Sequence, residues 1–195
     1  MAKEKKEQKY YNGIAVDSQE EIMTILYFEE LIEAGYVESL ERAPTYNLSE
    51  RLEKKYTQVV KMKTKTKEVE KNQVLLESHV YTPEFVVNWT HAGTVLFVDR
   101  MNNMTKIDAP FIGSYTTLIE VKPGFDQNNM TRLFKINQKW MWEKYQLYVN
   151  LIQPHKLFEE TFTPKAYLTT PTGKQRVIHW KVKSLEEYVN SLINQ

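Results

Sequence analysis

The sequence predicts an α/β fold, with a β-sheet flanked by helices. Three observations support this prediction. Helical and extended patterns alternate along the 195 residues, as they do in α/β proteins. Hydrophobic residues make up 42% of the chain and aromatic residues 12%, which is enough for a sizeable core. The mostly apolar run from Tyr115 to Val121 is stopped by Pro123-Gly124, which is typical of a buried strand.

The N-terminal part predicts a charged arm followed by a helix. Residues 1–9 are almost all polar and are expected to be disordered. Ser18 and Glu21 have the spacing of a capping box, so a helix is expected to begin at Asp17-Ser18. Gly35 is expected to end it.

The remainder of the chain, residues 10–195, is expected to form a single domain. Its core is expected to cover about residues 10–153, and residues 154–195 form a C-terminal extension. After the first helix, strands are predicted over residues 36–48 (with a kink at Pro44), 77–87, 94–98, 112–122, 148–153 and 176–182. Helices are predicted from Asn128-Asn129 to about Tyr145 and from the second capping box, Ser184 with Glu187, onward.

A lysine-rich segment lies between the first two predicted strands. Lys61, Lys63, Lys65 and Lys67 alternate with uncharged residues, so a strand here would place four ammonium groups on one face. Two interpretations stay open. The segment is an edge strand that its lysines protect from aggregation, or a ribbon that contacts phosphates.

Composition excludes several classes of function. The sequence has no cysteine, which removes disulfides and thiolate metal sites, and this fits a cytoplasmic protein. No apolar run reaches membrane-spanning length, and the N-terminus is too polar for a secretory signal. The four histidines lack metal-ligand spacing, and neither a phosphate-binding glycine loop nor a Gly-x-Ser-x-Gly motif occurs.

Glu120 and Lys122 are the strongest candidates for chemistry. They share one face of the predicted strand because side chains alternate with period 2. A carboxylate can bind a hard cation, and an ammonium beside it can stabilise charge on a reacting phosphate. The same pair is common on exposed strands without any function.

Four segments follow one another along the chain in a recognisable order. They are Tyr11–Glu21, Tyr81–Val86 with Pro83-Glu84, Ile119–Gly124, and a later helix with Gln138. Together they resemble the PD-(D/E)xK nuclease superfamily, in particular small phage-encoded endonucleases and Holliday-junction-resolvase-like enzymes of DNA recombination. Glu84 stands where that family usually has Asp, and Pro123 where it usually has Gly.

This resemblance implies a restriction-endonuclease-like core, with a central mixed sheet of about four to five strands between helices. It implies Mg²⁺- or Mn²⁺-dependent hydrolysis of DNA phosphodiester bonds. No membrane partner is expected, because no apolar run is long enough to cross a membrane. Glu21, Glu84, Glu120 and the Val121 carbonyl would hold the metal. Lys122 would orient the attacking water or stabilise negative charge, and Gln138 would help to position the site.

Several alternatives stay open within this interpretation. Glu21 is also explained by helix capping, and Gln138 by a partly exposed helix position. Asp99 competes with Glu84 as a strand-end acid. The DNA, branched or duplex, would contact basic residues of the lysine-rich segment and the later helix, and resolvases of this type usually act as homodimers. The basic residues are Lys61, Lys63, Lys65, Lys67, Lys135, Lys139 and Lys144.

Three other functions compete with an active nuclease. One is a catalytically silent DNA-binding or assembly protein that keeps the nuclease fold. Another is a transposase end-cleaving subunit, with residues 154–195 as the segment that docks its partner. The third is a structural or virion protein in which the Glu-x-Lys pair is coincidental.

Overall fold

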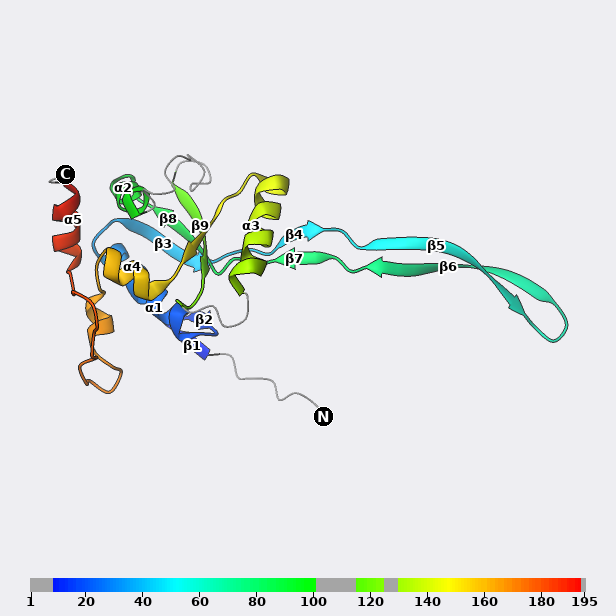
Figure 1. The fold of residues 1–195 in the computed structure, drawn as a ribbon, viewed down its shortest axis with the longest axis horizontal. Coiled ribbons are helices and arrows are strands. Elements are labelled where there is room, and N and C mark those ends of the chain that lie inside the picture. Colours follow the sequence, from blue (N-terminus) through cyan, green and yellow to red (C-terminus); the bar gives the residue numbers. More distant parts are fainter. Residues whose placement is uncertain (1–8, 101–114, 125–129, 194–195) are drawn as a thin grey trace. The chain divides into compact units, whose positions relative to one another are not determined.

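The computed structural model of the chain describes residues 9–100, 115–124 and 130–193 (Figure 1). The chain divides into two compact units. The first unit runs up to Pro44 and resumes at Pro83, and the second unit comprises Thr45–Thr82. Residues 1–8 of the predicted charged arm lie outside the described residues, as do Asn128-Asn129 and the start of the predicted strand 112–122.

The first unit is built on a mixed four-stranded sheet in the order β10-β9-β8-β3. The strands are β3 (Val37–Arg42), β8 (Phe85–Trp89), β9 (Thr116–Val121) and β10 (Val149–Ile152). β3, β8 and β9 form an antiparallel meander, and β10 runs parallel to β9. The α/β prediction with a sheet flanked by helices is confirmed.

Helix α1 (Gln19–Glu33) begins and ends where the sequence predicts. The Glu21 backbone N–H donates to the Ser18 hydroxyl over 3.1 Å, which satisfies one of the amides at the helix start. Gly35 adopts a φ of +78°, a left-handed conformation that suits glycine after a helix. Ala34, with its N–H on Glu30, closes the last turn.

One face of the sheet packs on α1. The alternating residues Phe85, Val87 and Ile119 are fully buried there against Ile25 and Phe28 of the helix. The same core includes Leu157 and Phe158 of α4 (Pro154–Glu160) and, beyond it, Phe162. This apolar burial is the main force that holds α1 and the C-terminal part against the sheet.

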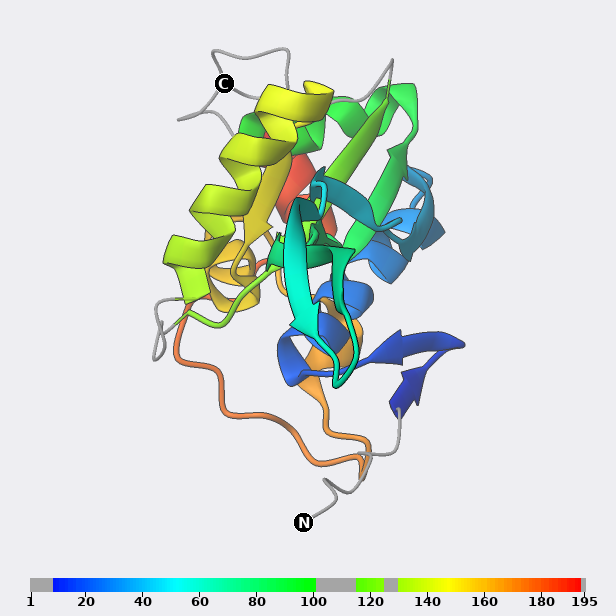
Figure 2. The same cartoon turned by 90° about the vertical axis from the view of Figure 1, so that its right-hand side faces the viewer.

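Helix α3 (Met130–Tyr145) lies against β10 (Figure 2). Its inward side is formed by Phe134 and Met141, which are buried. Between them, the Gln138 side-chain amide donates to the Val149 carbonyl over 2.6 Å. The predicted helix to Tyr145 and the predicted strand after it are confirmed.

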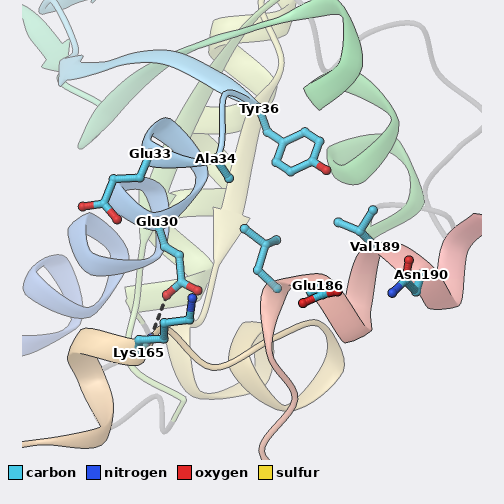
Figure 3. Close-up of a pocket in the computed structure, with 9 residues that line it drawn as sticks. Glu30, Glu33, Ala34, Tyr36, Lys165, Glu186, Val189 and Asn190 are labelled. Atoms are coloured by element: carbon cyan, nitrogen blue, oxygen red, sulfur yellow. Dashed lines mark hydrogen bonds between the residues drawn. The ribbon is translucent and has the colours of Figure 1, made fainter.

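The C-terminal part returns to the end of α1. It contains α4, the 3₁₀ helix η2 (Lys165–Leu168) and α5 (Leu185–Ile193). The predicted capping box of α5 is confirmed, because Ser184 and Glu187 exchange two hydrogen bonds of 2.7 and 3.1 Å. The Lys165 backbone N–H donates to Glu30 over 2.7 Å beside an open cavity of about 530 Å³ between α1, η2 and α5 (Figure 3).

The remaining elements of this unit are a short hairpin of β1 (Lys9–Tyr11) and β2 (Ile14–Val16), and the helix α2 (His91–Arg100). Across the described residues, none of the helices is both long and apolar enough to cross a membrane.

Four strand predictions are corrected by the structure. Residues 94–98 lie in α2 and form no strand, because a short apolar run does not distinguish a strand from a buried helix segment. Residues 176–182 are irregular. The predicted strands 36–48 and 77–87 are each divided in two, at Pro44 and at Pro83, because proline cannot donate to a strand ladder.

The second unit is a long two-stranded ribbon. β4 (Tyr46–Ser49) pairs with β7 (His79–Tyr81), and β5 (Leu52–Lys61) pairs with β6 (Thr66–Leu76), all antiparallel. The Met62 N–H donates to the Lys65 carbonyl over 2.8 Å and closes the turn between β5 and β6. The prediction of one strand through residues 61–67 is therefore wrong, and Lys61 and Lys67 lie on opposite faces of the ribbon.

Gly93 allows α2 to approach the turn after α1. A Cβ at this position would lie 1.7 Å from the Tyr36 carbonyl oxygen, which already accepts from the Thr90 N–H. We therefore expect Gly93→Ala to lower the free energy of unfolding by about 1–3 kcal/mol, measured by urea denaturation. Gly124→Ala is the matched control, because its added Cβ meets nothing within 4 Å. An equal, small effect of both changes would contradict the expectation.

Candidate active site

Glu84 and Glu120 are brought together by the pairing of β8 with β9. Phe85 lies opposite Ile119 in the antiparallel register, so the residue before Phe85 lies beside the residue after Ile119. The Glu84 N–H donates to the Ile119 carbonyl over 2.9 Å and fixes this arrangement. Both carboxylates are therefore at the same end of the two central strands.

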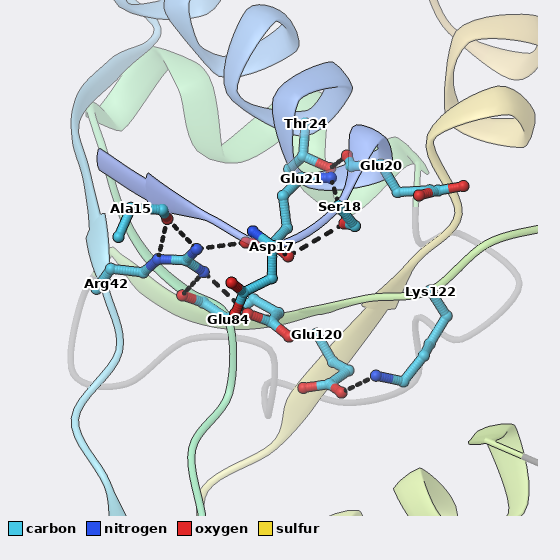
Figure 4. Close-up of polar contacts among 10 residues, drawn as sticks. All are labelled: Ala15, Asp17, Ser18, Glu20, Glu21, Thr24, Arg42, Glu84, Glu120 and Lys122. Atoms are coloured by element: carbon cyan, nitrogen blue, oxygen red, sulfur yellow. Dashed lines mark hydrogen bonds and ion pairs between the residues drawn. The ribbon is translucent and has the colours of Figure 1, made fainter. Parts of the chain in front are cut away.

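Glu21 reaches the same region from the first turn of α1 (Figure 4). Its side chain is buried and accepts hydrogen bonds from the Ser18 hydroxyl at 3.1 Å and the Asp17 N–H at 3.3 Å. Glu21 thus caps α1 and also lies beside the other acids. The helix N-terminus also favours a negative charge here.

Arg42, at the end of β3, is a member of the site that the sequence analysis missed. Its guanidinium pairs with Glu21 and also with Glu84, at 2.8 Å from the Glu84 Oε2 (Figure 4). It donates to the Ala15 carbonyl as well, and it stacks over Phe85 with 4.6 Å to the ring centroid. Nothing in the local sequence distinguishes this arginine from any other at a strand end.

Glu120 and Lys122 form an ion pair on the face that they share. The side chains are largely buried, with 6% of Glu120 and 16% of Lys122 exposed. Burial makes each charge depend on its partner, because an unpaired ion in this environment is costly. This pairing distinguishes them from a solvated Glu-x-Lys on an open strand.

The Glu84 carboxyl has a raised pKa. Burial raises the pKa of its carboxyl to about 6, and the nearby carboxylates of Glu21 and Glu120 add to the rise. Arg42 and Lys122 oppose it. The three acids are thus close enough to act on one another, although they are far apart in the sequence.

The raised pKa of Glu84 predicts a pH-dependent stability. The folded state holds the Glu84 proton more tightly than the unfolded state does. The stabilisation that this proton gives the fold is therefore complete below pH 4.5, the ordinary pKa, and is lost as the pH rises to about 6. Between pH 4.5 and about pH 6, the free energy of unfolding should therefore fall more for the wild type than for Glu84→Gln. Urea unfolding at a series of pH values measures this. Parallel curves for the two proteins would contradict the prediction, and Glu20→Gln is the control.

The other predicted site residues are placed differently. Val121 ends β9 and pairs with Ile152 of β10. Gln138 is held by its hydrogen bond to Val149, which accounts for a polar residue on the inner side of α3. Asp99 lies in α2, so its predicted position at a strand end is wrong, and its side chain lies outside the described part. Lys135, Lys139 and Lys144 are exposed on α3.

The site has the donors that a hard cation prefers, but it does not hold them as a formed metal centre. Carboxylate oxygens are the usual ligands of Mg²⁺ and Mn²⁺. Within residues 9–100, 115–124 and 130–193, no group of three His, Cys, Asp or Glu side chains is arranged to bind a metal ion. Arg42 and Lys122 instead pair with the acids, so a metal would have to displace Arg42 from Glu21 and Glu84.

Comparisons of the chain with protein families, with curated proteins and with solved structures gave no match.

Proposed function

We propose that this protein is a divalent-metal-dependent endodeoxyribonuclease with a restriction-endonuclease-like core. The observation that carries the proposal is the convergence of Glu21, Glu84 and Glu120 at one end of the central strands, with Lys122 beside them. The order α1, β3, β8, β9, α3, β10 supports it, because the resemblance implies a helix, a mixed sheet of about four strands and a further helix.

Glu21, Glu84 and Glu120 would hold Mg²⁺ or Mn²⁺, with the Val121 carbonyl as a further oxygen donor. The bound cation would supply charge stabilisation at the phosphate and activate a water molecule. This role requires the carboxylates to exchange Arg42 for the metal. Released from the acids, the planar guanidinium of Arg42 would be free to pair with a phosphate oxygen.

The protein's own groups would handle the proton and the developing charge. Lys122 is held by Glu120 at the strand end, where its ammonium can donate to the attacking water or to a phosphate oxygen. Glu84, which lies beside Glu120 at the same strand end, would hold the cation against the phosphate. The Glu21 carboxylate is held in place at the start of α1 by its contacts with Ser18.

DNA would contact the exposed basic residues of α3, Arg132, Lys135 and Lys139, which recur at helical spacing. Branched DNA as the substrate, a homodimer as the active form, a cytoplasmic location and a role in phage recombination are supported by the family resemblance alone.

A second candidate is a catalytically silent DNA-binding protein with the same fold. The pairing of all three acids with Arg42 or Lys122 favours it, because each acid has a cationic partner without a metal. Calorimetric titration with Mn²⁺, together with cleavage assays on branched, duplex and single-stranded DNA, separates the two. Metal binding and metal-dependent cleavage are expected, and a protein that binds DNA but neither binds Mn²⁺ nor cleaves would favour the second candidate.

A further inference from the structure

The register of β5 and β6 decides which side chains of the ribbon share a face. Directly paired residues in an antiparallel ribbon point to the same side, and successive pairs alternate. One face is therefore formed by the pairs Lys54–Gln73, Tyr56–Lys71, Gln58–Val69 and Val60–Lys67. It carries three lysines and no acid, and we call it the basic face.

On the opposite face of the ribbon, glutamates lie near the lysines. Its pairs include Thr57–Glu70 and Val59–Glu68, and Glu53 lies two residues from Lys55 on the same strand. Lys55 and Lys61, the lysines of this face, thus have acids beside or diagonal to them. The ribbon holds seven lysines and three glutamates between Leu52 and Leu76, so the uncompensated charge lies on the basic face and at the tip, where Lys63 and Lys65 lie.

Neither face has a cover within the described structure. Every residue of β5 is exposed, and β6 is exposed except for partial burial at Val69 and Val74. Tyr56 and Val60 lie exposed among the lysines of the basic face. A two-stranded ribbon with no second layer is only marginally stable alone, so a surface of this kind gains order when it meets a partner.

We propose that the basic face binds the phosphates of duplex DNA, with the ribbon along the major groove. The major groove of B-form DNA, about 12 Å wide, admits a two-stranded ribbon, whereas that of A-form RNA is too narrow for side chains to read. At about 3.4 Å per residue, β5 extends over about one turn of the duplex. The inference takes DNA as the partner from the proposed function, but it does not require cleavage.

The experiment measures binding of the full chain to duplex DNA by fluorescence anisotropy in EDTA, so that no cleavage occurs. Lys71→Gln and Lys55→Gln are matched variants, since each removes one positive charge at nearly the same level of the ribbon but on opposite faces. Lys71→Gln should weaken binding about threefold to tenfold and lower the slope of log K against log salt by about 0.9. Lys55→Gln should stay within about twofold with an unchanged slope.

The triple variant Lys54→Gln/Lys67→Gln/Lys71→Gln should lower the salt slope by about 2.7. Equal losses for Lys71→Gln and Lys55→Gln, or no loss for either, would overturn the inference, and so would tighter binding to duplex RNA than to duplex DNA. Circular dichroism checks that each variant is folded. Face-selective binding by a protein that cuts no DNA would overturn only the nuclease proposal. Cleavage without face-selective binding would overturn only this inference.

Discussion

The Glu120→Gln variant is expected to cleave DNA at least about 10²-fold more slowly than the wild type with Mg²⁺ or Mn²⁺. The change keeps the size of the side chain but removes the negative charge that would hold the cation. It also leaves Lys122 without its carboxylate partner in a largely buried position, so the ammonium loses its fixed place. Cleavage rates on branched and duplex DNA, with enzyme in excess, measure the loss directly.

Glu20→Gln is the matched control for this prediction. Glu20 precedes Glu21 in the first turn of α1, and its own backbone carbonyl accepts from Thr24, but its side chain is partly exposed. Cleavage by this variant should stay within about twofold of the wild type, because a solvated charge contributes little. Full activity of Glu120→Gln, or an equal loss for Glu20→Gln, would exclude the proposed site.

The parts of the fold that sequence patterns predict are those with local determinants. The capping boxes at Ser18 and Ser184 fix where α1 and α5 begin, because the bonds that satisfy a helix start lie within three residues. The strand before Pro123 and the strand β10 are apolar runs bounded by clear stops. Glu120 is a candidate because side chains alternate along its strand. Glu21 and Glu84 are candidates because of the family resemblance.

The ribbon could not be predicted in its true form. The Lys-x-Lys alternation continues from β5 through the turn into β6, so its period of two suggests one strand where the chain reverses. The turn has neither Asn-Gly nor Pro to mark it. The division of charge between its faces depends on cross-strand register, which only pairing reveals.

Arg42 could not be assigned for a related reason. Its partners Glu21 and Glu84 are distant in the sequence, and its role arises only when β3, β8 and α1 pack together. A single arginine before Ala43-Pro44 has no local pattern that indicates an ion pair. Contacts of this kind are properties of the tertiary structure.

Arg42→Met is expected to lower the free energy of unfolding by about 3 kcal/mol at neutral pH, measured by urea denaturation. Methionine keeps an apolar chain over Phe85 but removes the guanidinium. The Glu21 side chain, only 5% exposed, then loses its guanidinium partner, and Ser18 and Asp17 supply its remaining hydrogen bonds. The estimate is at the lower end for a buried pair because 32% of the Arg42 side chain is exposed.

A double-mutant cycle and a metal titration test this account. Adding Glu21→Gln to Arg42→Met should restore part of the lost stability, because the uncompensated buried charge is gone. Strict additivity of the two changes would contradict a direct coupling. Mn²⁺ should stabilise Arg42→Met more than it stabilises the wild type, since the cation then enters the acidic group without displacing a guanidinium. If Mn²⁺ stabilises neither protein, the acids serve only to pair with Arg42 and Lys122, and the silent DNA-binding protein becomes the better account of this site.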